Sequence, residues 1–128
     1  MASFTLIEQQ AQGDFFEPPN PQDGDRWLIR ERRLEDANGN PRGSFSVRCT
    51  YLRVFPNDAL IAVNGTNKIA GTGPGHPGGD ICTQGVFRFS DFSNPSVVIA
   101  IVGGTDEYRN ARGTVSLGAN GRFTFDVT

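Results

Sequence analysis

The chain has 128 residues, which is enough for one compact domain with one hydrophobic core and too few for two that fold independently. Its 16 glycines, 8 prolines and 10 phenylalanines, with a single methionine, are typical of short strands and many turns and argue against a helical bundle. With 12 basic and 14 acidic residues the formal net charge is −2, so the composition excludes the broad basic surface that nucleic-acid binding requires.

No segment approaches the ~20 consecutive apolar residues that span a membrane, and the first residues lack the pattern of a secretory signal. We therefore expect a cytoplasmic protein with no membrane or nucleic-acid partner. Two cysteines, Cys49 and Cys82, are too few for a disulfide framework, and together with His76 they lack the spacing of a zinc site. No metal and no cofactor are expected.

Apolar and polar residues alternate with a period of two along most of the chain, which indicates β-strands rather than helices. The alternation predicts eight strands, at residues 3–10, 26–34, 44–55, 59–65, 80–90, 96–102, 113–118 and 121–127. The dipeptides Asn38-Gly39 and Asn120-Gly121 favour the tight turns of antiparallel hairpins. Because no crossover helices separate the strands, we predict an all-β fold: a single eight-stranded antiparallel up-and-down β-barrel domain over residues 1–128, with a central pocket. A two-sheet sandwich is the alternative.

The first three predicted strands each gather large apolar side chains on one face, and two glutamates share these faces. The three faces are Phe4, Leu6, Glu8 and Gln10; Trp27, Ile29, Glu31 and Arg33; and Phe45, Val47, Cys49 and Tyr51. If these faces point inward, Glu8 and Glu31 lie in an apolar cavity, where they either pair with Arg33 and Gln10 or take up protons. A reversed phase on either strand would instead leave that glutamate in solvent.

The segment 64–79 is rich in glycine and proline and is interpreted as too irregular for a strand. We expect a long loop at one rim of the barrel, either a mobile flap or a plain connection. His76 lies inside it, and a histidine in a flexible loop is more often solvated than catalytic.

The strand expected at 96–102 is apolar on both faces, from Val97 to Val102. One barrel buries only one face of a strand, and a large exposed apolar patch is unusual on a monomer. We therefore expect a homo-oligomer, a dimer or a trimer, with this strand at the contact.

Residues 101–115, IVGGTDEYRNARGTV, resemble the segment Gly-Gly-Thr/Ser-Gly-x-Phe/Tyr-x-x-Ala-x-Gly of dirigent proteins and allene oxide cyclases, with Asp106 in place of the third glycine. Paired glycines allow a sharp turn after a buried strand, and Tyr108 is placed to plug the end of a barrel. The resemblance, which includes bacterial small cyclases of the same superfamily, implies a barrel with a pocket for a small hydrophobic molecule.

Shorter matches to the same families follow in order along the chain. Glu8 and Gln10 correspond to first-strand residues that act on an epoxide and position water in the cyclases, and Glu31 falls at the acidic or amide position of the second strand. Cys49 lies near a cysteine of the third cyclase strand, and Gln84-Gly85 fits a Gln-Gly pair in the fifth. Together with the strand faces, these matches give Glu31 and Glu8 as candidate catalytic residues; the candidate substrate-binding residues are Gln10, Trp27, Ile29, Phe45, Val47, Cys49, Tyr51 and Gln84.

These residues favour a cofactor-free cyclase or isomerase that acts on a small hydrophobic natural-product intermediate, by cycloaddition or by cyclisation of an epoxide or polyene. Such chemistry needs a shaped dry cavity and one or two groups that stabilise developing charge. Glu31 would act as general acid or base, and Glu8 would stabilise positive charge or control protonation. One alternative is a dirigent-type protein that orients a ligand without changing its bonds, and another is a structural barrel filled by its own side chains.

Overall fold

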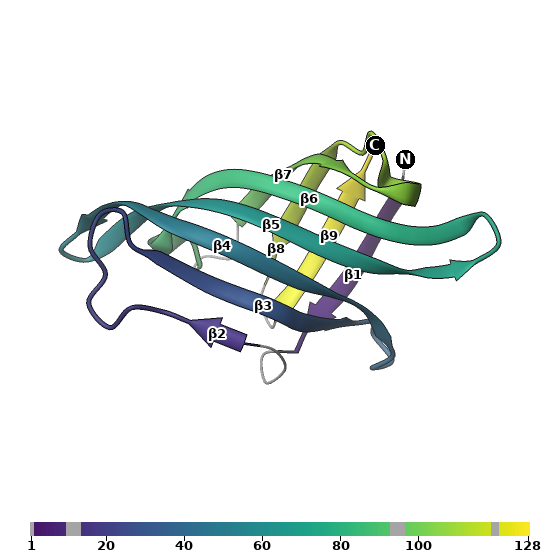
Figure 1. The fold of residues 1–128 in the computed structure, drawn as a ribbon, viewed down its shortest axis with the longest axis horizontal. Helices are drawn as coiled ribbons and strands as arrows, with labels where there is room; N and C mark the ends of the chain where they lie inside the picture. Colours follow the sequence, from purple (N-terminus) through teal and green to yellow (C-terminus); the bar gives the residue numbers. More distant parts are fainter. Residues whose placement is uncertain (1, 10–13, 93–96, 119–120) are drawn as a thin grey trace.

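The structure is a computed structural model that describes residues 2–9, 14–92, 97–118 and 121–128, and it is built almost wholly of strands (Figure 1). The described elements are β1 (Ala2–Glu8), β2 (Asp14–Phe16), β3 (Arg26–Glu35), β4 (Pro41–Phe55), β5 (Asp58–Gly73), β6 (His76–Arg88), the 3-10 helix η1 (Phe89–Phe92), β7 (Val97–Gly104), the 3-10 helix η2 (Asp106–Tyr108), β8 (Gly113–Leu117) and β9 (Arg122–Val127). No helix among the described residues is long and apolar enough to cross a membrane.

Eight of the strands form one closed antiparallel ring, which confirms the predicted barrel. The ring runs β1-β9-β8-β7-β6-β5-β4-β3, and β3 then pairs with β1, with Glu8 opposite Leu34. The short strand β2 pairs with the earlier part of β3, with Asp14 opposite Arg30, so it continues the line of β1 along the same edge. The β1–β3 seam is short, with Ile7 opposite Glu35 and Glu8 opposite Leu34.

The glycine- and proline-rich segment forms strands, so the expected irregular loop at 64–79 is wrong. β5 and β6 continue through it as one long hairpin that extends beyond the rest of the barrel (Figure 1). Period-two alternation persists here, since Asn67 and Ile69 are buried and Lys68 is exposed, but the many glycines hide it in the sequence. His76 lies on the surface of this hairpin, with Nδ1 3.2 Å from a carboxylate oxygen of Glu107 in η2.

One end of the barrel is filled by side chains. The rings of Phe4 and Phe125 stack with centroids 4.8 Å apart, and Tyr108 of η2 lies 6.5 Å from Phe4, as the plugging role predicts. Gly104 precedes η2, and any side chain there would collide with the backbone oxygen of Asp80. The aliphatic residues that complete this packed end are Leu6, Leu34, Ile69, Ile81, Ile101 and Val127.

β7 divides its apolar residues between the two faces of the sheet. Val97, Ile99 and Ile101 are buried inside the barrel, whereas Val98 is 56% exposed and Val102 is 44% exposed on the outside. The apolar outer face expected from the sequence is therefore present on the single chain.

Candidate functional site

The half of the barrel away from the packed end is hollow. It holds a cavity of about 580 Å³, within the ~300–1,000 Å³ range of small-molecule sites. Glu17, Phe89 and Gly118 are the exposed residues of its lining, and they mark the mouth. The apolar wall consists of Trp27, Ile29, Phe45, Val47, Cys49, Val63, Phe87, Val97, Ile99, Val115, Leu117 and Phe123. A barrel filled by its own side chains, one of the three alternatives, does not fit this hollow.

A β-bulge in β3 decides which charged side chains face the cavity. Ile29 lies opposite Val47 and Arg32 lies opposite Phe45, so a step of three residues on β3 matches a step of two on β4. The extra residue is accommodated at Glu31, whose φ of 53° is in the left-handed region and whose backbone N–H donates to Ser46 Oγ at 2.9 Å. A bulge of this kind reverses the alternation of every residue beyond it.

The expectation that Glu31 shares the inner face with Trp27 and Ile29 is therefore wrong. Glu31 is exposed and does not line the cavity, whereas Arg32 does. Arg33, expected to neutralise the buried glutamates, is instead 2.8 Å from Glu35 and is 40% exposed at its side chain. The prediction failed because uninterrupted alternation along β3 places Glu31 and Arg33 inside. No residue type between Arg30 and Arg33 indicates the extra residue of the bulge.

Arg32 forms an ion pair with Glu8 inside the cavity. Arg32 Nη1 donates to Glu8 Oε1 from β3 to β1, and each side chain is only 11% exposed. Both residues line the otherwise largely apolar cavity. Breaking such a pair by removing one partner leaves an uncompensated buried charge, so the two side chains stabilise each other in this position.

Two further polar residues, Asn67 on β5 and Thr83 on β6, face the cavity and were missed from the sequence. Both are buried, and Asn67 Nδ2 donates to the backbone oxygen of Ile81 at 3.3 Å. Asn67 was missed because it falls in the segment interpreted as a loop. Thr83 was missed because the match at Gln84-Gly85 placed Gln84 in the pocket, and alternation then turns the neighbouring Thr83 outward.

The other predicted site residues fall into three groups. Trp27, Ile29, Phe45, Val47 and Cys49 line the cavity with Glu8, as expected. Tyr51 is buried but lies outside the lining, and Gln10 lies outside the described residues.

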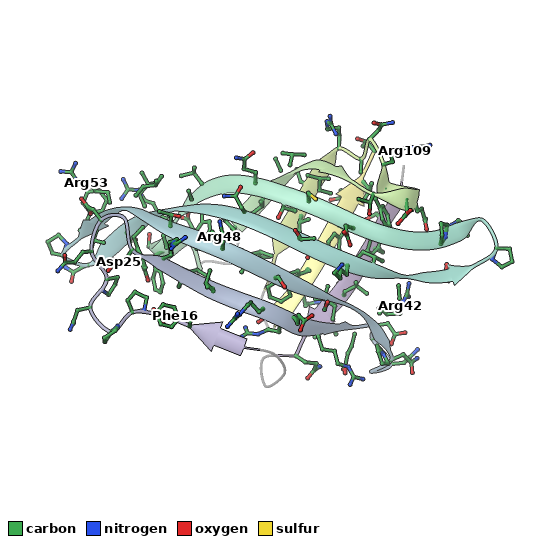
Figure 2. All side chains as sticks on the ribbon, viewed as in Figure 1. Phe16, Asp25, Arg42, Arg48, Arg53 and Arg109 are labelled. Carbon is green, nitrogen blue, oxygen red and sulfur yellow. The ribbon has the colours of Figure 1, made fainter. Side chains whose placement is uncertain are left out.

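Gln84 does not face the cavity, so its predicted place in the pocket is wrong. Thr83 points inward on β6, and the pleat therefore turns Gln84 outward, where it is exposed. It lines a shallow outer groove that also holds Arg48, which projects from the outer face of β4 (Figure 2).

Burial affects the chemistry of two groups on β4, Cys49 in the cavity wall and Tyr51 outside it. Desolvation raises the pKa of the Cys49 thiol from 9.0 to about 12, so the thiol stays protonated at neutral pH and is a poor nucleophile. Desolvation also raises the pKa of Tyr51, and a hydrogen bond to Glu17 at the mouth adds to the effect. Among the described residues, no three histidine, cysteine, aspartate or glutamate side chains are grouped so as to hold a metal ion.

Comparison with known proteins shows that this chain resembles a solved structure in its fold. The sequence matches no protein-family model and no curated protein. Among solved structures, pyocyanin demethylase superposes with a TM-score of 0.77 at 20% sequence identity, over 99% of this chain and 100% of that one. The resemblance to allene oxide cyclases and dirigent proteins stays a prediction, and the chain is shown to share the fold of a small β-barrel protein, pyocyanin demethylase.

Proposed function

We propose that this chain is an enzyme that encloses one small, largely apolar molecule in the barrel and rearranges it without a cofactor. The observation that carries the proposal is the Glu8–Arg32 ion pair, held in an otherwise mostly apolar cavity of about 580 Å³. A cyclisation or isomerisation moves atoms within one molecule and therefore needs no co-reactant. The substrate class we propose is a hydrophobic natural-product intermediate such as an epoxide or polyene.

The cavity supports this chemistry in two ways. Its walls exclude water and hold a flexible molecule in a near-attack shape. The Arg32 guanidinium can donate to an oxygen on which negative charge develops, and the Glu8 carboxylate can stabilise positive charge or accept a proton from carbon. In a water-poor site these preorganised charges are worth more than in bulk solvent. Under this proposal Arg32 occupies the cavity position predicted for Glu31, and the general acid–base role predicted for Glu31 passes to Glu8.

The shared fold with pyocyanin demethylase supports the proposal that a small molecule can react inside such a barrel. That protein's name describes an enzyme acting on a small molecule, so a barrel of this shape can house such chemistry. At 20% identity the likeness carries the fold only, and fold does not fix the reaction. The proposal therefore depends on the residues of this cavity.

A dirigent-type role, in which the barrel orients a ligand and changes no bond, is the second candidate. The mostly apolar lining favours it, because such a wall can bind and shape a ligand without supplying a reacting group. Under both candidates we propose that the partners are a small hydrophobic molecule and further copies of the chain, in a cytoplasmic dimer or trimer.

The experiment that separates the two candidates is a search for isobaric products. Wild-type protein is incubated with hydrophobic epoxides, polyenes and quinone methides, and chromatography with mass spectrometry detects any product of unchanged mass. Parallel samples contain Glu8→Gln or, as matched control, Glu31→Gln, which alters a neighbouring but exposed carboxylate. Product with wild type and Glu31→Gln but not with Glu8→Gln supports the enzyme. Ligand binding without product supports the dirigent role.

A further inference from the structure

The cavity has a second polar wall, formed by Asn67 on β5 and Thr83 on β6. Asn67 is 4% exposed and Thr83 is 7% exposed, and both line the cavity. In the ring of eight strands β6 lies four strands from β1 in either direction, so Thr83 lies across the barrel from Glu8. Buried polar side chains of this kind almost always have hydrogen-bond partners.

The orientation of the Asn67 amide is fixed by the backbone. Asn67 Nδ2 donates to the carbonyl oxygen of Ile81, which can only accept, so the amide nitrogen must lie on that side. Oδ1 therefore points away from Ile81. Within the part of the chain that the structure describes, neither this oxygen nor the Thr83 hydroxyl has a hydrogen-bond partner.

Gly65 keeps the space in front of Thr83 open. It lies opposite Thr83 in the β5–β6 pairing and lines the cavity. A Cβ at this position would lie 2.7 Å from Thr83 Oγ1. Gly65 is not among the glycines of positive φ, so the backbone does not require glycine there; the missing side chain leaves a notch beside the hydroxyl.

Asn67 lies level with Arg32 of the ion pair along the barrel wall, whereas the notch at Gly65 lies in the next inward-facing row, with Val47 and Ile29. Asn67 is opposite Phe45 on β4, and Phe45 is opposite Arg32 on β3, so the three residues form one transverse row. At the usual spacing of neighbouring strands, the Cα atoms of Asn67 and Arg32 are roughly 10 Å apart. One molecule seated against Phe45 can therefore reach both polar walls.

We infer that Asn67 and Thr83 form a specificity subsite that selects ligands carrying a hydroxyl or N–H group; the inference rests on the proposed function of the cavity. The ligand's O–H or N–H donates to Asn67 Oδ1, which is an acceptor only. The Thr83 hydroxyl can donate in return to a ligand hydroxyl oxygen. A site with buried polar groups of this kind rejects analogues that leave them unpaired.

The test compares two probes of nearly equal shape, 1-naphthol and 1-methylnaphthalene, by titration calorimetry on the full chain. For wild type we expect 1-naphthol to bind about tenfold more tightly, as one or two neutral hydrogen bonds allow. Thr83→Val is isosteric and breaks no hydrogen bond among the described residues, and it should remove most of this preference. Thr83→Ser keeps the hydroxyl and should retain the preference, and Gly65→Ala should weaken it by crowding the hydroxyl.

Each outcome bears on the inference. Equal affinity of wild type for the two probes would overturn the subsite and leave the cavity's proposed function standing. An unchanged preference in Thr83→Val and in Asn67→Leu, with both variants folded by circular dichroism, would also overturn it. Failure of both probes to bind wild type at millimolar concentration would overturn the proposed function together with the subsite.

Discussion

Arg32 and Glu8 are 24 positions apart in the sequence and form an ion pair across the seam where β3 closes the barrel on β1. The bulge at Glu31 makes this possible, since it turns Arg32 rather than Glu31 toward the cavity. The candidate site therefore depends on one inserted residue.

The first prediction concerns the stability of the pair. Arg32→Leu leaves the Glu8 carboxylate buried without its partner and should lower the free energy of unfolding by about 3–5 kcal/mol. The double variant Glu8→Leu/Arg32→Leu replaces both charges and should recover most of that loss. Urea unfolding of the three proteins measures the difference. A double variant as unstable as Arg32→Leu would contradict the mutual stabilisation.

The second prediction concerns the bulge. Glu31 holds a left-handed φ of 53°, which non-glycine residues adopt at a cost of about 1 kcal/mol. Glu31→Gly should therefore leave stability unchanged or raise it slightly, whereas Glu31→Val should lower it by roughly 1–2 kcal/mol because a β-branched residue resists this conformation. Thermal unfolding compares the two. Equal effects would show that the bulge is not held at this residue.

How much of this could be predicted from the sequence differs between the fold and the site. Alternation identified the barrel and the inward side chains Trp27, Ile29 and Phe45, because burial on one face imposes a period of two. Alternation cannot reveal a bulge. The bulge position is occupied by Glu31, not by the glycine or asparagine that usually marks left-handed backbone in a sequence. Asn67 could not be predicted as a cavity residue for a different reason. The glycines that follow it are typical of a loop, but strand β5 continues through Gly73.

The third prediction concerns Cys49 and pH. Its thiol is only 1% exposed, with a pKa raised from 9.0 to about 12, so above pH 9.0 the unfolded chain releases this proton and the folded chain keeps it. The buried thiol therefore stabilises the fold fully below pH 9.0. As the pH rises from 9.0 toward 12, the free energy of unfolding decreases by up to roughly 1.4 kcal/mol per pH unit. The stability lost in Cys49→Ala should accordingly be smaller at pH 10 than at pH 8. Urea unfolding at the two pH values checks this, and a constant difference would contradict the burial of the thiol.

Cys49→Ala should at the same time leave turnover nearly unchanged, because a protonated thiol does not act as a nucleophile. The measurement is the rate of the isobaric reaction before and after treatment with a thiol reagent. Stoichiometric inactivation that Cys49→Ala abolishes, in protein that is still folded, would assign the thiol a chemical role.

The fourth prediction concerns the outer face of β7. Val98 and Val102 are exposed there, and Val86 on the adjacent strand β6 is 59% exposed, so this face should be covered by a second copy of the chain. Val98→Glu should release folded monomers, while Thr5→Glu, on the outer face of β1, should not. Sedimentation velocity at micromolar concentration measures the state. A monomeric wild type would refute the oligomer.

The most direct test of the central claim is the turnover of Glu8→Gln against Glu31→Gln, with a substrate found in the isobaric screen. Each change removes one carboxylate and keeps its shape, but only Glu8 lines the cavity and pairs with Arg32. We predict that Glu8→Gln lowers kcat by about a hundredfold or more with little change in KM, and that Glu31→Gln stays within about twofold of wild type. Near-normal kcat in Glu8→Gln, or a comparable loss in Glu31→Gln, would contradict the assignment of the chemistry to this ion pair.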